Sequence, residues 1–239
     1  RHNKANIQQK IQEFENEKEK ELYQAKIDFF INIAHEIRTP LTLIKSPLEK
    51  VTRDIKLSPS AKNYLTIVDK NANRLLDLVN QLLDFRKTEI EGYKLNFIHT
   101  DIIALMQETF ERFHDTAEQE ALQMIIECNV KSFYAFIDKE ACTKILSNLL
   151  SNAIKYARSK IIVRFEAQDG ERFTIDIMND GKPISEEIKE KIFEPFYWDD
   201  SSIHKSGTGL GLPLARSLAE MHEGSLTLEE SPAGLIIFR

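Results

Sequence analysis

The chain has 239 residues, of which 42% are hydrophobic and 29% are charged, and its formal net charge at neutral pH is −6. This length accommodates one or two domains, and the acidic balance excludes a general electrostatic attraction to nucleic acid or anionic lipid. No apolar run approaches the roughly 20 residues of a membrane-spanning helix. Cys128 and Cys142 lack metal-ligand spacing, and we expect both to be buried free thiols in a reducing compartment.

The chain opens on charged helical sequence without an initiator methionine, which indicates a fragment of a longer protein. The first ninety residues contain no glycine and are expected to be helical. Residues 1 to about 55 form the first expected helix, and a second helix follows a turn in which Ser58 is the cap and Pro59 the first helical residue.

Apolar residues recur at spacings of three and four along both helices, as they do in a coiled coil. They are Phe30, Ile33, Ile37, Leu41, Ile44, Leu48, Val51 and Ile55 in the first helix, and Ala61, Leu65, Val68, Ala72, Leu75, Val79 and Leu82 in the second. A single hairpin cannot bury both stripes fully. The pattern therefore predicts a homodimer joined as a four-helix bundle.

An adjacent histidine and glutamate, His35 and Glu36, lie on the first helix, and Pro40 follows five residues after the histidine. Pro40 cannot donate a hydrogen bond to the carbonyl of Glu36 and crowds it, so the helix is expected to bend there. His35 projects from the flank of the apolar seam, where an imidazole beside a carboxylate is typical of a nucleophile with its own base. From this stretch of sequence alone, the alternative is a solvated histidine on the surface of a helix.

Beyond an expected hinge at residues 87–94, which contains Gly92, helical and strand patterns alternate. Helices are predicted at residues 102–120, 139–157 and 212–222, and strands at residues 122–128, 161–167, 173–178, 226–228 and 235–238. Asp138 is the expected N-cap of the helix at 139–157. The predicted fold class is α+β: a helical hairpin in a dimeric four-helix bundle, then an α/β sandwich with a mixed sheet and helices on one face.

Three strings in this second part carry candidate chemistry. Asn148, Asn152 and Lys155 share one helix face, where amide oxygens suit a hard cation such as Mg²⁺ and the lysine suits a phosphate. A solvated polar face is the alternative, with Ile145, Leu149 and Ile154 packed inward. Residues 179–184 (Asn-Asp-Gly-Lys-Pro-Ile) follow a strand, as any strand-ending turn does.

The third string is Gly207-Thr208-Gly209-Leu210-Gly211-Leu212, which leads into a helix. Alternate glycines let backbone amides approach a phosphate, and the following helix adds its positive end. The spacing differs from the dinucleotide fingerprint and the preceding segment is polar, which argues against a Rossmann site. A flexible loop is the alternative.

Together these strings resemble the catalytic core of sensor histidine kinases along nearly the whole chain. The five similar strings stand in the family's order: a phosphoacceptor box at residues 34–41, an asparagine box at 148–156, a first glycine box at 179–184, a phenylalanine box at 192–196 and a second glycine box at 207–212. The resemblance implies a coiled-coil signalling helix at residues 1–28, a dimerisation and histidine phosphotransfer domain at 29–90, a hinge at 91–96 and a gyrase-like ATP-binding domain at 97–239.

The resemblance also implies roles for individual residues. His35 would attack the γ-phosphorus of ATP, Glu36 would take up or orient the ring proton, and Thr39 would position water for dephosphorylation of a regulator. A simpler role for the Thr39 hydroxyl is a bond back into its helix. Asn152 would ligate Mg²⁺ with Asn148 as its helper.

The other positions implied to bind nucleotide are Lys155 at a phosphate, Tyr156 and Asn179 at the adenine, Gly181 and Ile184 in the first glycine box, Phe193 and Phe196 as anchors of a lid at residues 185–206, Lys205 in that lid, and Gly207, Thr208, Gly209, Leu210, Gly211 and Leu212 around the phosphates. In hydrolytic relatives a glutamate that activates water stands at the position of Asn148. An amide cannot act as that base, which suits transfer to a histidine.

The chain departs from the family pattern at positions 179, 183 and 198, and in a degenerate last glycine box near residues 233–238, where Ile236 replaces a threonine. Asn179 stands where an aspartate usually accepts a hydrogen bond from the adenine amine, and Pro183 replaces a glycine. The uncharged acceptor weakens that bond by roughly 1 kcal/mol. Trp198 replaces a lid arginine, and Lys205 is the expected substitute.

The expected function is that of an ATP-dependent protein-histidine kinase, which autophosphorylates His35 and passes the phosphoryl group to a response-regulator receiver domain. The partner regulator, separate or in the same longer chain, is also a candidate for dephosphorylation by this protein. We expect the cytoplasmic portion of an inner-membrane sensor, attached through upstream segments. A degenerate kinase acting as a dimeric, nucleotide-sensing scaffold is the alternative, and a plain ATPase is a third.

Overall fold

The computed structural model describes residues 14, 18, 33–34, 37–46, 48–51, 57–89, 94–168, 172–197, 209–231 and 234–239. The chain divides into two compact units, residues 1–89 and residues 90–239. Over the described ranges, no helix combines the length and the apolar character that crossing a membrane requires.

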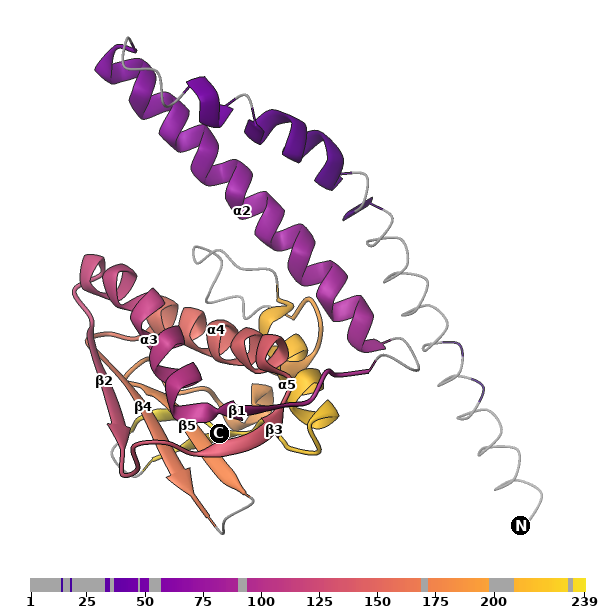
Figure 1. Ribbon diagram of the computed structural model, residues 1–239, viewed down its shortest axis with the longest axis vertical. Coiled ribbons are helices and arrows are strands. Elements are labelled where there is room, and N and C mark those ends of the chain that lie inside the picture. The colour runs from indigo at the N-terminus through magenta and orange to yellow at the C-terminus, as the bar shows by residue number, and fades with distance from the viewer. Residues whose placement is uncertain are drawn as a thin grey trace. The chain divides into compact units, whose positions relative to one another are not determined.

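The N-terminal unit contains the helix α2 (Pro59–Glu89) and, beside it, helical residues 37–46 and 48–51 (Figure 1). The hydroxyl of Ser58 accepts the backbone N–H of Ala61 at 3.2 Å, which confirms Ser58 as the cap and Pro59 as the first helical residue. Pro40 lies within the helical residues. The two helices meet through the buried side chains of Ala34, Val79 and Leu83.

Each helix of this unit buries one apolar stripe and exposes another. Leu41 and Leu48, seven residues apart, are buried in the hairpin, as are Ala72 and Val79. The exposed stripe consists of Ile37, Ile44 and Val51 on the first helix and Val68 and Leu75 on α2, all between 39% and 51% exposed. Exposed apolar side chains that recur every seven residues are the pattern of a coiled-coil surface. The hairpin therefore retains an apolar face beyond its own core.

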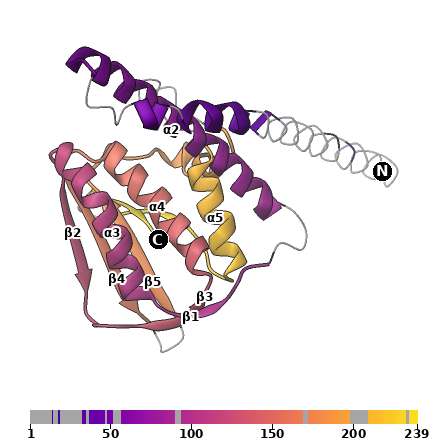
Figure 2. The ribbon, with the colours of Figure 1, turned by 45° about the horizontal axis from the view of Figure 1, so that its top comes forward.

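The C-terminal unit is built on a five-stranded sheet of order β2-β4-β5-β7-β6. Its strands are β2 (Gln123–Cys128), β4 (Lys160–Ala167), β5 (Phe173–Asn179), β6 (Leu228–Glu230) and β7 (Ile236–Phe238). Among the strands that the structure describes in this sheet, β2 and β4 alone pair in parallel. The helices α3 (Ile102–Gln119), α4 (Lys139–Tyr156) and α5 (Gly211–Met221) lie on one face of this sheet (Figures 1 and 2), which confirms the predicted mixed sandwich.

The core of this unit lies between the helices and that face of the sheet. Its fully buried side chains include Met106 from α3, Leu150 from α4, Ile161 and Phe165 from β4, and Ile177 from β5. Branched and aromatic residues on the strands thus pack against the apolar stripes of the helices.

Two strands and two short helices were not predicted from the sequence. Strands β1 (Ile98–Asp101) and β3 (Tyr134–Ile137) form a separate antiparallel pair, and the 3₁₀ helices η1 (Glu186–Ile188) and η2 (Lys191–Phe193) follow β5. The expectation for the cysteines was wrong in part, since Cys128 is exposed and Cys142 is half-buried, although both are free.

Candidate functional site

The polar face predicted on the asparagine-rich helix lies on α4. Asp138 accepts the backbone N–H of Ala141 at 2.9 Å and caps the helix, as predicted. Leu149 and Leu150 point into the core. Asn148, Asn152, Lys155 and Tyr156 are half-buried on α4, and the Lys155 ammonium lies 4.7 Å from the centroid of the Tyr156 ring.

The end of β5 approaches the C-terminal end of α4. Asn179 is 2% exposed, and its side-chain oxygen accepts the backbone N–H of Gly181 at 3.0 Å. A Cβ at Gly181 would lie 2.7 Å from that oxygen and 2.7 Å from the carbonyl oxygen of Tyr156. A side chain at position 181 would therefore separate the first glycine box from α4, and glycine permits the contact.

The carboxylate of Asp180 holds the turn between α4 and β4. It accepts the backbone N–H groups of Arg158, Ser159 and Lys160 at 2.9–3.1 Å and the Ser159 hydroxyl at 2.6 Å. Burial alone would raise the pKa of Asp180, but the hydroxyl and the three backbone donors together hold it well below its usual value. Asp180 had no assigned role from the sequence, because its partners lie about twenty residues earlier in the chain.

The second glycine box turns the chain into α5 beside α4. Gly209 has a φ of +69°, a backbone conformation that favours glycine, and its carbonyl accepts the N–H of Phe196 at 2.9 Å. Leu210 is buried. A Cβ at Gly211 would lie 3.3 Å from the side-chain oxygen of Asn148, so the first turn of α5 contacts the polar face of α4.

The phenylalanine box is fixed by contacts that the sequence did not reveal. Phe193 is buried, its ring meets that of Phe238 edge to face, and the Arg216 guanidinium lies 3.4 Å from its ring centroid. Arg216 also bonds Glu190 at 2.8 Å and keeps the pKa of that carboxyl below its usual value. No local pattern singled out Arg216, because its partners are Phe193 on η2, Glu190 just before η2 and the carbonyl oxygen of Leu226, all distant in the sequence.

The predicted site residues fall into three groups. Asn148, Asn152, Lys155, Tyr156, Asn179, Gly181, Ile184, Phe193, Phe196, Gly209, Leu210, Gly211 and Leu212 lie in the C-terminal unit, and Thr39 is exposed on the N-terminal unit. His35, Glu36, Lys205, Gly207 and Thr208 lie outside the described residues, as does Trp198.

The donor set on α4 suits a magnesium ion that is also bound to phosphate. Asn148 and Asn152 offer neutral amide oxygens, ligands that a hard cation accepts, and Mg²⁺ commonly takes few protein ligands beside substrate phosphates. Within the described ranges, a grouping of histidine and carboxylate side chains at metal-ligand distance occurs at His114, Asp115 and Glu118 on α3. All three of those side chains are exposed.

Two protein families match the chain. The His Kinase A (phospho-acceptor) domain matches residues 25–91, and the histidine kinase-, DNA gyrase B- and HSP90-like ATPase matches residues 137–238. Histidine kinase P4 of Formosa agariphila is 33% identical over 99% of this chain and 18% of its own length. Sensor histidine kinase WalK of Bacillus subtilis is 31% identical over 85% of this chain and 34% of its own length, so the chain spans a minor part of both relatives.

Solved structures share the architecture. Histidine kinase ThkA, in complex with response regulator protein TrrA, is 26% identical with a TM-score of 0.60, over 88% of this chain and 60% of that chain. Full-length ShkA in complex with AMPPNP has a TM-score of 0.74 over 87% of this chain and 43% of that chain, and at 22% identity it shows the fold alone.

The phospho-acceptor match covers the helical hairpin, and the ATPase match covers the unit in which α4, the end of β5 and the start of α5 meet. With both domains present in this order, the chain belongs to the sensor histidine kinase family, as a catalytic core of that family.

Proposed function

We propose that this chain transfers the γ-phosphoryl group of ATP to His35 and then to an aspartate of a receiver domain. The observation that carries the proposal is the convergence of three separated strings in one unit. Gly211 lies against Asn148, and Gly181 lies against the backbone of Tyr156. Residues implied to bind phosphate and adenine thus border the same helix, α4, at its C-terminal half.

In this reaction a neutral ring nitrogen of His35 attacks the γ-phosphorus in line with the leaving ADP oxygen. The nitrogen–phosphorus bond forms as the bond between the γ-phosphorus and the bridging oxygen breaks, and ADP departs with the electron pair. Glu36 takes up the ring proton. Asn148 cannot act as a base toward water, because its amide has no basic site, so hydrolysis is not promoted there.

The nucleotide contacts follow from the side chains around α4. Asn179 accepts a hydrogen bond from the adenine amine, Lys155 pairs with a phosphate, and Asn152 binds Mg²⁺ with support from Asn148. The ion, when bound, neutralises developing phosphate charge. Phe193, buried against Phe238, anchors the segment that covers the nucleotide.

The active form is a homodimer, since the hairpin exposes a second apolar stripe that another copy would cover. Its phosphate acceptor is a response-regulator receiver domain, and the ThkA structure contains a kinase with such a regulator. One relative is named a hybrid kinase, hybrid signal transduction histidine kinase D of Dictyostelium discoideum, so the acceptor is either separate or part of a longer chain. We assign the chain to the cytoplasmic portion of an inner-membrane sensor.

The competing function is a degenerate kinase that senses nucleotide and acts as a scaffold. Asn179, Pro183 and Trp198 favour it, because each removes a group that the family usually offers to ATP. The intact His35–Glu36 pair and the complete second glycine box favour the enzyme, since a scaffold requires neither.

The test is incubation of the chain with γ-labelled ATP and Mg²⁺. We expect acid-labile, alkali-stable label that is absent from His35→Ala, whose ATP affinity is unchanged. Absence of label despite measurable ATP binding contradicts the kinase and supports the scaffold. Steady phosphate release unaffected by His35→Ala points to a plain ATPase.

A further inference from the structure

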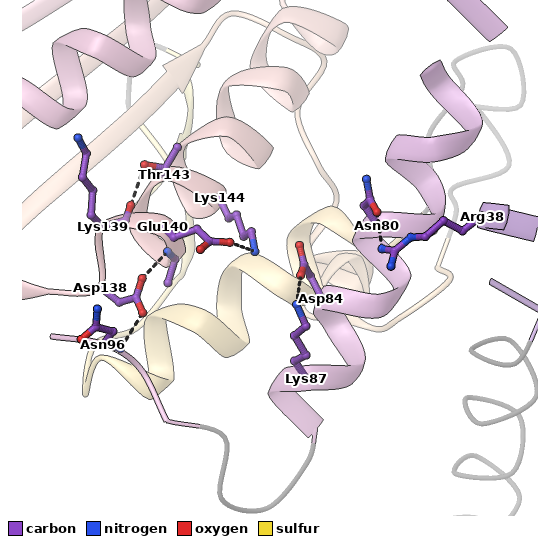
Figure 3. Close-up of polar contacts among 11 residues, drawn as sticks. Arg38, Asn80, Asp84, Lys87, Asn96, Asp138, Lys139, Glu140, Thr143 and Lys144 are labelled. Carbon is purple, nitrogen blue, oxygen red and sulfur yellow. Dashed lines mark hydrogen bonds and ion pairs between the residues drawn. The ribbon is translucent and has the colours of Figure 1, made fainter. Parts of the chain in front are cut away.

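The carboxylate of Asp138 makes two separate contacts. Its Oδ1 accepts the N–H of Ala141 at 2.9 Å and caps α4. Its Oδ2 accepts the backbone N–H of Asn96 at 2.8 Å, from the segment that precedes β1 (Figure 3). Burial alone would raise the pKa of Asp138, but these N–H groups lower it, so the carboxylate stays ionised and accepts both bonds.

The same segment also meets the end of α5. The backbone N–H of Asp138 donates to Nε2 of His222 at 3.1 Å, and Nδ1 of that ring lies 2.7 Å from the Leu218 carbonyl oxygen. The ring therefore carries its proton on Nδ1. The Phe97 ring lies edge-on to His222, with centroids 5.3 Å apart. Residues 96 and 97 are thus held by the N-cap of α4 and by the end of α5.

The same two helices border the proposed nucleotide site, where Gly211 at the start of α5 meets Asn148 in the middle of α4. The segment around Asn96 follows the last residues of α2 and joins the phospho-acceptor hairpin to the ATPase unit. Asp138 therefore bonds this connection to the helix that carries the candidate phosphate ligands.

We propose that Asp138 is a positioning residue for phosphoryl transfer: its Oδ2 bond to Asn96, called here the Asn96–Asp138 tether, restricts how the ATPase unit reaches His35. The proposal rests on the kinase function proposed above. Transfer between two linked units depends on the effective concentration and orientation that the connection allows. Loss of the Asn96–Asp138 bond therefore lowers the fraction of molecules in which bound ATP can reach His35. ATP binding itself is left intact.

Two pairs of variants distinguish the effect of losing the Asn96–Asp138 tether from the effect of changing the helix cap at Asp138. Asn96→Pro removes the N–H that Asp138 accepts, and Asn96→Ala keeps it. Asp138→Asn keeps an oxygen for Ala141 but places an amide N–H₂ opposite the N–H of Asn96. Its matched control is Asp101→Asn at the cap of α3, where Oδ1 alone accepts both Ile103 and Phe133. Asparagine retains that oxygen, and Asn caps helices as well as Asp does.

The experiment measures, in the full chain, the rate constant of histidine labelling at saturating ATP and the dissociation constant for ATP. We expect Asn96→Pro and Asp138→Asn to lower the rate constant about fivefold to tenfold. The dissociation constant should change by less than about twofold, because the ligands on α4 are untouched. Asn96→Ala and Asp101→Asn should match the wild-type chain.

Equal labelling rates in Asn96→Pro and Asn96→Ala overturn the tether. A parallel loss of ATP affinity in Asn96→Pro also overturns it, since the bond then supports the site itself. A wild-type chain that binds ATP and acquires no label refutes the proposed function and, with it, the positioning role. The two failures are distinguishable because the second appears before any substitution is made.

Discussion

In the proposed nucleotide site, Asn179 is the residue whose side chain is expected to contact the adenine amine. It is 2% exposed and already accepts the N–H of Gly181, so its oxygen is fixed at the end of β5. We predict that Asn179→Asp strengthens ATP binding up to about fivefold, because a charged acceptor adds roughly 1 kcal/mol to a hydrogen bond. Isothermal titration calorimetry measures the change.

GTP provides the control for that substitution, because guanine has a carbonyl where adenine has its exocyclic amine. The gain should be confined to ATP. Equal or weaker ATP binding by Asn179→Asp contradicts the assignment of this position to the adenine amine.

Asp180, the next residue, contributes to stability through its ionisation. Its folded pKa is held below the ordinary aspartate value by the Ser159 hydroxyl and three backbone N–H groups, against the opposing effect of burial. The contribution is therefore fully present above the unfolded pKa, near 4, and is lost as the pH falls toward the folded value.

We predict that the free energy of unfolding of the wild-type chain decreases more between about pH 5 and pH 3 than that of Asp180→Asn. Urea unfolding at each pH measures both. Parallel curves for the two proteins over this range contradict the role of the carboxylate.

At the scale of elements, long periodic segments could be predicted and short exposed ones could not. Helices α3, α4 and α5 and strands β4 and β5 carry apolar patterns that burial in one core imposes. Strands β1 and β3 are four residues each, and Phe136 is 70% exposed on β3, so the alternation that reveals a half-buried strand is absent.

The residues of the candidate site also divide into those that the sequence could predict and those that it could not. Short sequence strings identified the residues around α4, the end of β5 and the start of α5, because their glycines and asparagines stand at short, fixed spacings. The cap at Asp138 was predictable for the same reason. Its bond to Asn96, 42 residues away, and the contact of Arg216 with Phe193 depend on tertiary structure and leave no local signal.

In the whole molecule, the exposed apolar stripe of the hairpin calls for a second copy of the chain. The stripe of Ile37, Ile44, Val51, Val68 and Leu75 is exposed in a single chain, and apolar area of this kind drives association. We predict that the double variant Ile44→Glu with Leu75→Glu is a monomer, because four charges would otherwise be buried in the bundle. Sedimentation equilibrium measures the mass.

Thr66→Glu is the matched control. Thr66 is exposed on the side of α2 opposite Leu75 and lies outside the stripe. It should remain a dimer. A monomeric wild-type chain, or a double variant that still dimerises, contradicts the four-helix bundle.

In the proposed reaction the two units supply the two partners, the phosphate acceptor in the hairpin and the nucleotide site around α4. The most direct measurement is site-resolved mass spectrometry of the chain after incubation with ATP and Mg²⁺, with digestion kept alkaline to preserve phosphohistidine. We predict a phosphoryl group on His35 and none on the other histidines. Phosphorylation at a different residue, or none at all while ATP is bound, contradicts the proposed role of His35.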